Sequence, residues 1–184
     1  MRDLIDQLEL SLQHPFYFLS LFMALAIPDI AGALDSDDGC ANGKRYVRWY
    51  DQWARPQFGV LLKQTLPPEA AAHLDDVQSP MTGEECYRFR CSLLHQGKTH
   101  DSRSPHKRII FVEPGATPHM LHGNVSNGAL NIDVRLFCLE IIRGTREWLD
   151  VVEGAPRFNE NYSAFVRRYP DGLPPYIGGL PVVG

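Results

Sequence analysis

The strongest structural signal in the sequence is an apolar run, Pro15-Phe-Tyr-Phe-Leu-Ser-Leu-Phe-Met-Ala-Leu-Ala-Ile27. A helix that is apolar on all sides is typical of an element at the centre of a domain. Proline suits the first turn of such a helix, and we expect Pro28-Asp29 to end it. The run is 13 residues long, shorter than the roughly 20 residues that span a bilayer. We therefore predict a buried core helix and no contact with a membrane.

Amphipathic helices are predicted on both sides of this run. Their apolar residues recur three or four positions apart, which is the period of a helix with one buried face. The stretch from 44 to 54 carries aromatic residues at this spacing, and we expect them to pack against the apolar run. The predicted helices cover residues 2–13, 44–54, 82–95, 133–152 and 158–169, with a shorter one around Leu61.

The clearest strand is Arg108-Ile-Ile-Phe-Val112, which is rich in β-branched residues and is followed by Glu113-Pro-Gly115. Residues 119–125 and 128–132 are expected to pair with it in a small antiparallel hairpin or three-stranded sheet. The predicted fold class is therefore mainly α, a helical bundle with a small β insertion. Within one domain, residues 1–184, we expect a helical part at 1–106, the β insertion at 107–132, C-terminal helices at 133–169 and an irregular tail at 170–184.

Composition narrows the classes of function. The chain has 184 residues and a formal net charge of −4, so its overall charge does not attract nucleic acid or an anionic membrane, and any such contact needs a local basic patch. Its four cysteines lack the two-residue spacing of zinc knuckles and redox motifs. We expect free thiols, a cytoplasmic location and no metal or other cofactor.

The helix predicted at 82–95 has clear end signals. Thr82 and Glu85 have the spacing of a capping box, and Gly97 is placed as a C-terminal cap. At about 100° per residue, Arg90 falls at the centre of the apolar face, between Cys86 and Leu94. The polar face is expected to carry Arg88, Ser92 and Glu84.

An arginine on an apolar face requires a partner, because an unpaired buried charge is costly. Two interpretations remain open for Arg90. In the structural one, it forms a buried ion pair with Asp29, Asp51 or Asp133. In the functional one, it faces a cleft or a subunit interface that admits phosphate.

His95 also has two interpretations. On an ideal helix it lies about 140° from Arg90, so the two side chains would converge only if the last turn unwound. A histidine near a helix C-terminus is often a cap or a partner of the helix dipole. The alternative is a catalytic group, because imidazole ordinarily titrates near neutral pH.

Arg90-Cys-Ser-Leu-Leu-His95 resembles the signature of HEPN domains, an arginine followed by four to six residues and a histidine near the end of a helix. Further blocks, in this order, are similar to an uncharacterised bacterial family over about residues 15 to 150. They are Ala26-Ile-Pro-Asp-Ile30, Arg45-Tyr-x-x-Trp49, Cys86-Tyr-x-x-Arg-Cys-x-x-Leu-His95 and Asp133-x-Arg-x-Phe137.

The resemblance implies an all-helical domain that acts as a homodimer and cleaves RNA without a metal. Some HEPN proteins have lost this activity and serve as binding modules or as partners of antitoxin-type proteins. In an active member, Arg90 and His95 would be catalytic and Arg88 would hold the substrate backbone. A basic patch of Arg103, His106, Lys107 and Arg108 is either a steering site for RNA or a solvated loop.

One other pattern, a pair of histidines, is not expected to bind a metal. His119 and His122 invite a zinc site, but three-residue spacing would need a helix, and glycine and proline surround them. The alternative to the ribonuclease is a non-catalytic protein- or nucleotide-binding module. In that interpretation Arg90 is a structural buried ion and His95 is a helix cap.

Overall fold

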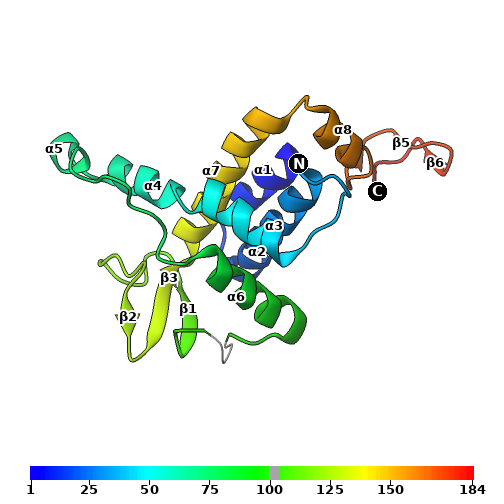
Figure 1. Cartoon of the computed structure of the whole chain (residues 1–184). Helices are drawn as coiled ribbons and strands as arrows, with labels where there is room; N and C mark the ends of the chain where they lie inside the picture. Colours follow the sequence, from blue (N-terminus) through cyan, green and yellow to red (C-terminus); the bar gives the residue numbers. More distant parts are fainter. Residues whose placement is uncertain (100–103) are drawn as a thin grey trace.

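The computed structural model describes residues 1–99 and 104–184. It is mainly helical, with a three-stranded sheet at one end of the helical body (Figure 1). The helices are α1 (Arg2–Ser11), α2 (Tyr17–Leu34), α3 (Gly43–Trp49), α4 (Gln57–Thr65), α5 (Pro68–Ala71), α6 (Gly83–Gln96), α7 (Val134–Val152) and α8 (Pro156–Ser163), with a π-helical turn, η1 (Tyr50–Ala54), directly after α3. The sheet contains β1 (Arg108–Val112), β2 (Val125–Ser126) and β3 (Ala129–Asp133).

Helix α2 is the central element, as the apolar run predicts. It packs against α1, α3, α6, α7 and α8, and Leu25, Ile27 and Ala31 are completely buried. By length and composition it could also cross a membrane, but half of it is buried inside the domain, as in the core helix of a globular protein. The prediction that this helix is too short to span a bilayer was therefore wrong, although the prediction of a core helix is confirmed.

The prediction that Pro28-Asp29 ends this helix was also wrong, because α2 continues to Leu34 with Pro28 inside it. A proline in a helix interior removes one hydrogen bond, at a cost of about 3 kcal/mol. The turns beyond Pro28 bury Ala31 and Leu34 in the core, and this apolar burial offsets the loss. As a result Asp29 belongs to the core helix rather than to a loop.

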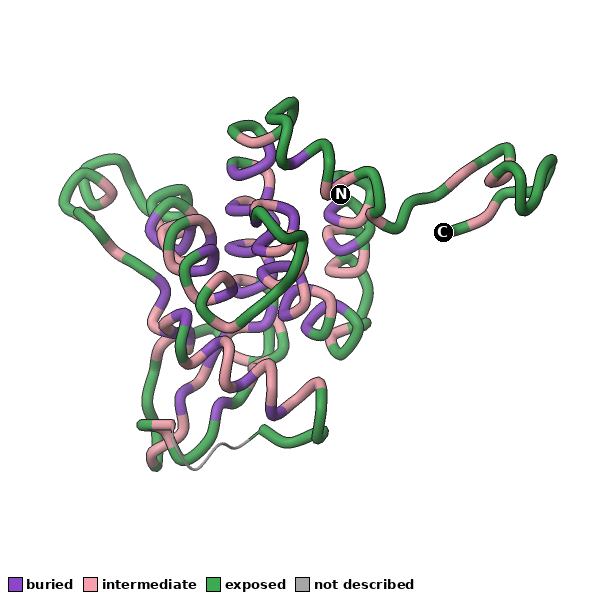
Figure 2. Tube along the Cα trace, turned by 45° about the vertical axis from the view of Figure 1, so that its right-hand side comes forward, coloured by how far each residue is buried: buried purple, intermediate pink, exposed green. Residues whose placement is uncertain are grey.

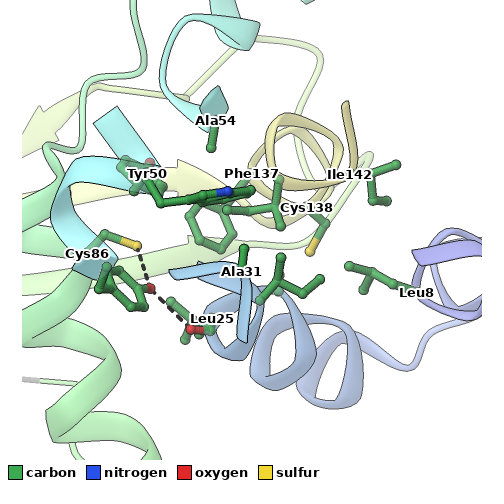
Figure 3. Close-up of a cluster of buried hydrophobic side chains, with 14 of the residues drawn as sticks. Leu8, Leu25, Ala31, Tyr50, Ala54, Cys86, Phe137, Cys138 and Ile142 are labelled. Atoms are coloured by element: carbon green, nitrogen blue, oxygen red, sulfur yellow. Dashed lines mark hydrogen bonds between the residues drawn. The ribbon is translucent and has the colours of Figure 1, made fainter. Parts of the chain in front are cut away.

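The aromatic residues after residue 44 pack in the core, as expected. Tyr46 donates a hydrogen bond from its hydroxyl to the Leu25 carbonyl, at 3.1 Å, and lies 3.3 Å from the Cys86 sulfur (Figure 3). Tyr50 packs beside Phe137 of α7, with ring centroids 6.5 Å apart. These contacts join α2, α3, η1, α6 and α7 around one core.

The sheet differs from the predicted antiparallel arrangement. Its strand order is β1-β3-β2, with β1 parallel to β3 and β2 antiparallel to β3. The long connection between β1 and β2 allows β3 to return alongside β1 in the same direction. Asn127 and Gly128 both have positive φ angles, which suits a tight turn between β2 and β3. Most of the strand predicted at 119–125 is instead loop.

The chain end also differs from prediction. Helix α8 ends at Ser163, and the tail predicted to be irregular contains paired strands. β4 (Arg168–Tyr169) pairs with β7 (Val182–Val183), and β5 (Gly172–Leu173) pairs with β6 (Ile177–Gly178). This segment projects from the body (Figures 1 and 2).

Helix α7 and η1 approach closely at Gly144, and this contact generates a prediction. A Cβ atom on Gly144 would overlap the backbone carbonyl of Trp53, which cannot rotate away. We expect Gly144→Ala to lower the free energy of unfolding by about 1–3 kcal/mol, despite the higher helix propensity of alanine. Gly178→Ala is the control in denaturant unfolding, because a Cβ there meets nothing within 4 Å. Equal stability of the two variants would contradict the close contact.

Candidate functional site

Helix α6 begins and ends as its sequence predicts. The Thr82 hydroxyl accepts a hydrogen bond from the Glu85 amide, and the Glu85 carboxylate accepts one from the Thr82 amide. Gly97 closes the helix with a φ of 65°. Asp51 accepts a hydrogen bond from the Gly83 amide at 2.8 Å, so it stabilises the start of α6 and is not the partner of Arg90.

The buried face of α6 differs from the predicted one. Cys86, Phe89 and Ser92 are buried, although Ser92 was expected on the polar face. Arg90 therefore lies beside the buried face rather than at its centre, and its side chain is 20% exposed. This position leaves part of the guanidinium close to solvent.

Asp29 is the acidic partner of Arg90. Its Oδ2 lies 2.5 Å from Arg90 Nη2, and the Asp29 side chain is 14% exposed. Burial raises the pKa of the Asp29 carboxyl, and the nearby guanidinium opposes this shift. Asp133, the third candidate, instead accepts a hydrogen bond from the Leu136 amide at 2.8 Å and caps α7. The ion pair thus joins α2 to α6.

Arg90 also reaches His95. The distance between Arg90 Nη1 and His95 Nε2 is 2.8 Å, and His95 is exposed. The expectation that the two side chains would not meet without unwinding was wrong, because α6 stays helical to Gln96. The arginine side chain is long enough to span the angular separation. Asp29, Arg90 and His95 therefore form a continuous polar row that runs from the core helix to the surface.

Three of the other predicted substrate-binding residues lie on α6, on β1 or directly before β1, and they are Arg88, Lys107 and Arg108. Arg88 pairs with Glu84, at 3.5 Å. Arg88 and Arg108 line a small cavity between α6 and β1, together with Ser92 and His106. Lys107 immediately precedes β1, whereas Arg103 lies outside the described residues. The structure thus brings Arg88 and Arg108 together in a cavity that neither Arg90 nor His95 lines.

A second contact between titratable side chains, which sequence reasoning missed, lies deep in the domain. His122 Nε2 is 3.1 Å from Glu140 Oε1, and both side chains are completely buried. Phe58 stacks on His122 with ring centroids 4.6 Å apart. Burial raises the pKa of Glu140, and contact with His122 opposes this shift. The available sequence signal was a glutamate on the apolar face of α7, next to Ile141.

The two histidines considered as a zinc pair lie in different environments. His119 is exposed in the loop before β2, whereas His122 is enclosed with Glu140. Over residues 1–99 and 104–184, no group of three or more His, Cys, Asp or Glu side chains is arranged to hold a metal ion.

Comparisons of the chain with models of protein families, with characterised proteins and with solved structures find no significant match. The functional argument therefore depends on the geometry of Asp29, Arg90 and His95.

The ion pair between α2 and α6 predicts a stability effect. Asp29→Asn leaves the Arg90 charge partly buried without a counterion. We expect the free energy of unfolding to fall by about 1–3 kcal/mol, less than for a fully enclosed pair because water reaches part of both groups. Denaturant unfolding measures this change. Asp38→Asn removes the exposed carboxylate that pairs with Arg45 and is the control, with a smaller effect. Equal losses would contradict a special role for Asp29.

The buried Glu140 predicts a pH dependence. Its raised pKa means that the folded state keeps the proton to a higher pH than the unfolded chain. The contribution of Glu140 to the free energy of unfolding therefore falls as pH rises from about 4.3 to the raised pKa. Glu140→Gln removes this contribution, so its stability relative to wild type should increase with pH over that interval.

Denaturant unfolding at several pH values tests this expectation, with Glu160→Gln as an exposed control that should track wild type. If wild type instead gained stability relative to Glu140→Gln as pH rose, the carboxylate would be stabilised by folding, and the expected direction would be wrong.

Proposed function

We propose that the protein is a metal-independent endoribonuclease with a HEPN-like helical bundle. The observation that carries this proposal is the 2.8 Å contact between Arg90 Nη1 and the exposed His95 Nε2. Asp29 holds the same guanidinium from the core side. RNA cleavage without a metal needs a group that transfers protons and a group that stabilises the charge on the phosphate. A surface imidazole beside a fixed guanidinium can supply both.

The reaction needs no nucleophile from the protein. The 2′-hydroxyl of RNA attacks the adjacent phosphorus, and the bond from phosphorus to the 5′-oxygen breaks. His95 either takes the 2′-hydroxyl proton while water protonates the leaving oxygen, or protonates the leaving oxygen while water takes the 2′-hydroxyl proton. Arg90 stabilises the charge on the phosphoryl oxygens. The scissile phosphate would accept hydrogen bonds from Nη1 in place of His95. The products are a 2′,3′-cyclic phosphate and a 5′-hydroxyl.

The remaining parts of the proposal concern binding and location. Arg88, Arg103, Lys107 and Arg108 would hold the RNA backbone and give the acidic chain a local basic surface. We further propose a homodimer in the cytoplasm, regulated by an antitoxin-type protein partner, with no cofactor.

One observation favours a second candidate, a non-catalytic protein- or nucleotide-binding module. Arg90 already has a carboxylate partner, so its charge is accounted for without a substrate. In this function Arg90 is a structural ion that ties α6 to α2, and His95 stabilises the end of α6.

RNA cleavage distinguishes the two candidates. Wild-type protein in the presence of EDTA should produce fragments ending in 2′,3′-cyclic phosphate. His95→Ala should lower the rate about 10²–10⁴-fold, because it removes general acid–base catalysis. RNA with a 2′-deoxy sugar at the cleavage position should stay intact, because it lacks the nucleophile.

His119→Ala is the matched control, an exposed histidine outside the row, and should cleave as wild type does. Wild type and His95→Ala with the same residual activity would exclude the ribonuclease and leave the binding module.

A further inference from the structure

A pocket lies where α1, the segment that follows α8 and the last strand of the chain meet (Figure 1). Its volume is about 260 Å³, close to the lower end of the roughly 300–1,000 Å³ that is typical of sites for small molecules. The pocket therefore has room for one small ligand. The side chains that matter for its chemistry are Asp3, Gln7, Tyr162, Phe165, Arg167 and Arg168.

The pairing of β4 with β7 holds two arginines at the pocket. Arg168 is opposite Val183 in this pairing, and both residues line the pocket. The Arg167 amide donates a hydrogen bond to the Gly184 backbone oxygen at 2.8 Å, and the Gly184 amide donates one to the Arg167 carbonyl at 3.0 Å. The backbone that carries the two arginines is therefore fixed at the edge of the pocket.

Aromatic rings, rather than an acid, orient the Arg167 guanidinium. Its Cζ lies 5.7 Å from the ring centroid of Tyr162 and 5.5 Å from that of Tyr169, within the range of cation–π interactions. Over residues 1–99 and 104–184, neither Arg167 nor Arg168 forms an ion pair with a carboxylate, whereas Arg2 of α1 forms two. A guanidinium that is held in place without a counterion is suited to bind an anion, and its planar donors match phosphate oxygens.

A column of stacked rings reaches the same pocket. Phe158, Tyr162 and Phe165 stack in this order, with adjacent ring centroids 5.2 Å apart and interplanar angles of 15° and 17°. Phe158 is buried, whereas Tyr162 and Phe165 are partly exposed and line the pocket. Nucleobases bind to proteins by stacking on aromatic rings beside positive charges. The pocket thus combines ring surface for a base with cations for a phosphate.

Asp3 and Gln7 face the pocket from α1. Their spacing of four residues places them on one side of the helix, and both line the pocket. A carboxylate and an amide provide hydrogen-bond acceptors and donors for the polar edge of a base or for ribose hydroxyls. Asp3 is the one carboxylate among the side chains that line the pocket, so the two arginines leave it with a positive charge in an acidic chain.

We propose that this pocket binds a nucleoside monophosphate. The base lies against Phe165, the phosphate accepts hydrogen bonds from Arg167 and Arg168, and the polar side chains of α1 bind the edge of the nucleoside. Neither Arg90 nor His95 lines this pocket, so the inference does not depend on the ribonuclease activity.

Isothermal titration of the full chain with AMP, GMP, CMP and UMP tests this proposal. At least one of them should bind with a Kd below about 1 mM. Arg167→Gln should raise that Kd at least about tenfold, because it removes charge-assisted hydrogen bonds to the phosphate. Phe165→Leu should raise it about fivefold or more, because it removes stacking surface but keeps an apolar side chain.

Arg157→Gln is the matched control. Arg157 is an arginine of α8 outside the pocket that pairs with Asp37 on the surface, and this variant should bind as wild type does. Circular dichroism verifies that each variant is folded. Wild type that binds none of the nucleotides at about 1 mM would overturn the proposal, and so would wild-type affinity in Arg167→Gln or in Phe165→Leu.

Two further measurements identify the ligand groups and the place of binding. The matching nucleoside and ribose 5-phosphate should each bind at least about tenfold more weakly than the nucleotide, because each lacks one of the recognised groups. Equal binding of ribose 5-phosphate would overturn recognition of the base. In NMR spectra the nucleotide should shift the amide signals of Gln7 and Phe165. Shifts confined to the surroundings of Arg90 and His95 would overturn this site and place the nucleotide at the polar row instead.

Discussion

The ion pair between Asp29 and Arg90 is the interaction on which the candidate site depends. It forms only because α2 stays helical through Pro28 and carries Asp29 to the side of α6. The capping box and Gly97 fix the length of α6, and thereby the position of Arg90 on it. The core packing of α2 and the end signals of α6 together place one guanidinium beside a surface histidine.

The Asp29–Arg90 ion pair and the His122–Glu140 contact differ in their exposure. The side chains of His122 and Glu140 are completely buried, and Phe58 stacks on His122, so substrate cannot reach them and their role is architectural. Asp29 and Arg90 are partly exposed, and the row continues to the exposed His95. A mostly buried carboxylate behind a partly exposed guanidinium orients that guanidinium toward His95. This difference selects the row on α6 as the functional candidate.

Local sequence signals predicted the elements whose ends are set by local chemistry. The capping box at Thr82, the glycine at 97 and the strand Arg108–Val112 all appear as expected.

The sequence signals failed where tertiary packing decides the structure. Pro28 did not end α2 because the following turn is buried, and β1 is parallel to β3 because a long connection permits it. The contact of Arg90 with His95 was missed because a helical wheel records the direction of a side chain and not its reach. Asp29 could be named only as one of three acids, since sequence periodicity does not show which helices are neighbours.

A double-mutant cycle between Asp29 and Arg90 tests this account most directly. The free energy of unfolding would be measured for wild type, Asp29→Asn, Arg90→Gln and the double variant. The account predicts that the losses are not additive, with a coupling free energy of about 1 kcal/mol or more. Additive losses within about 0.3–0.5 kcal/mol would show that the two charges do not interact, and would contradict the pairing that directs Arg90 toward His95.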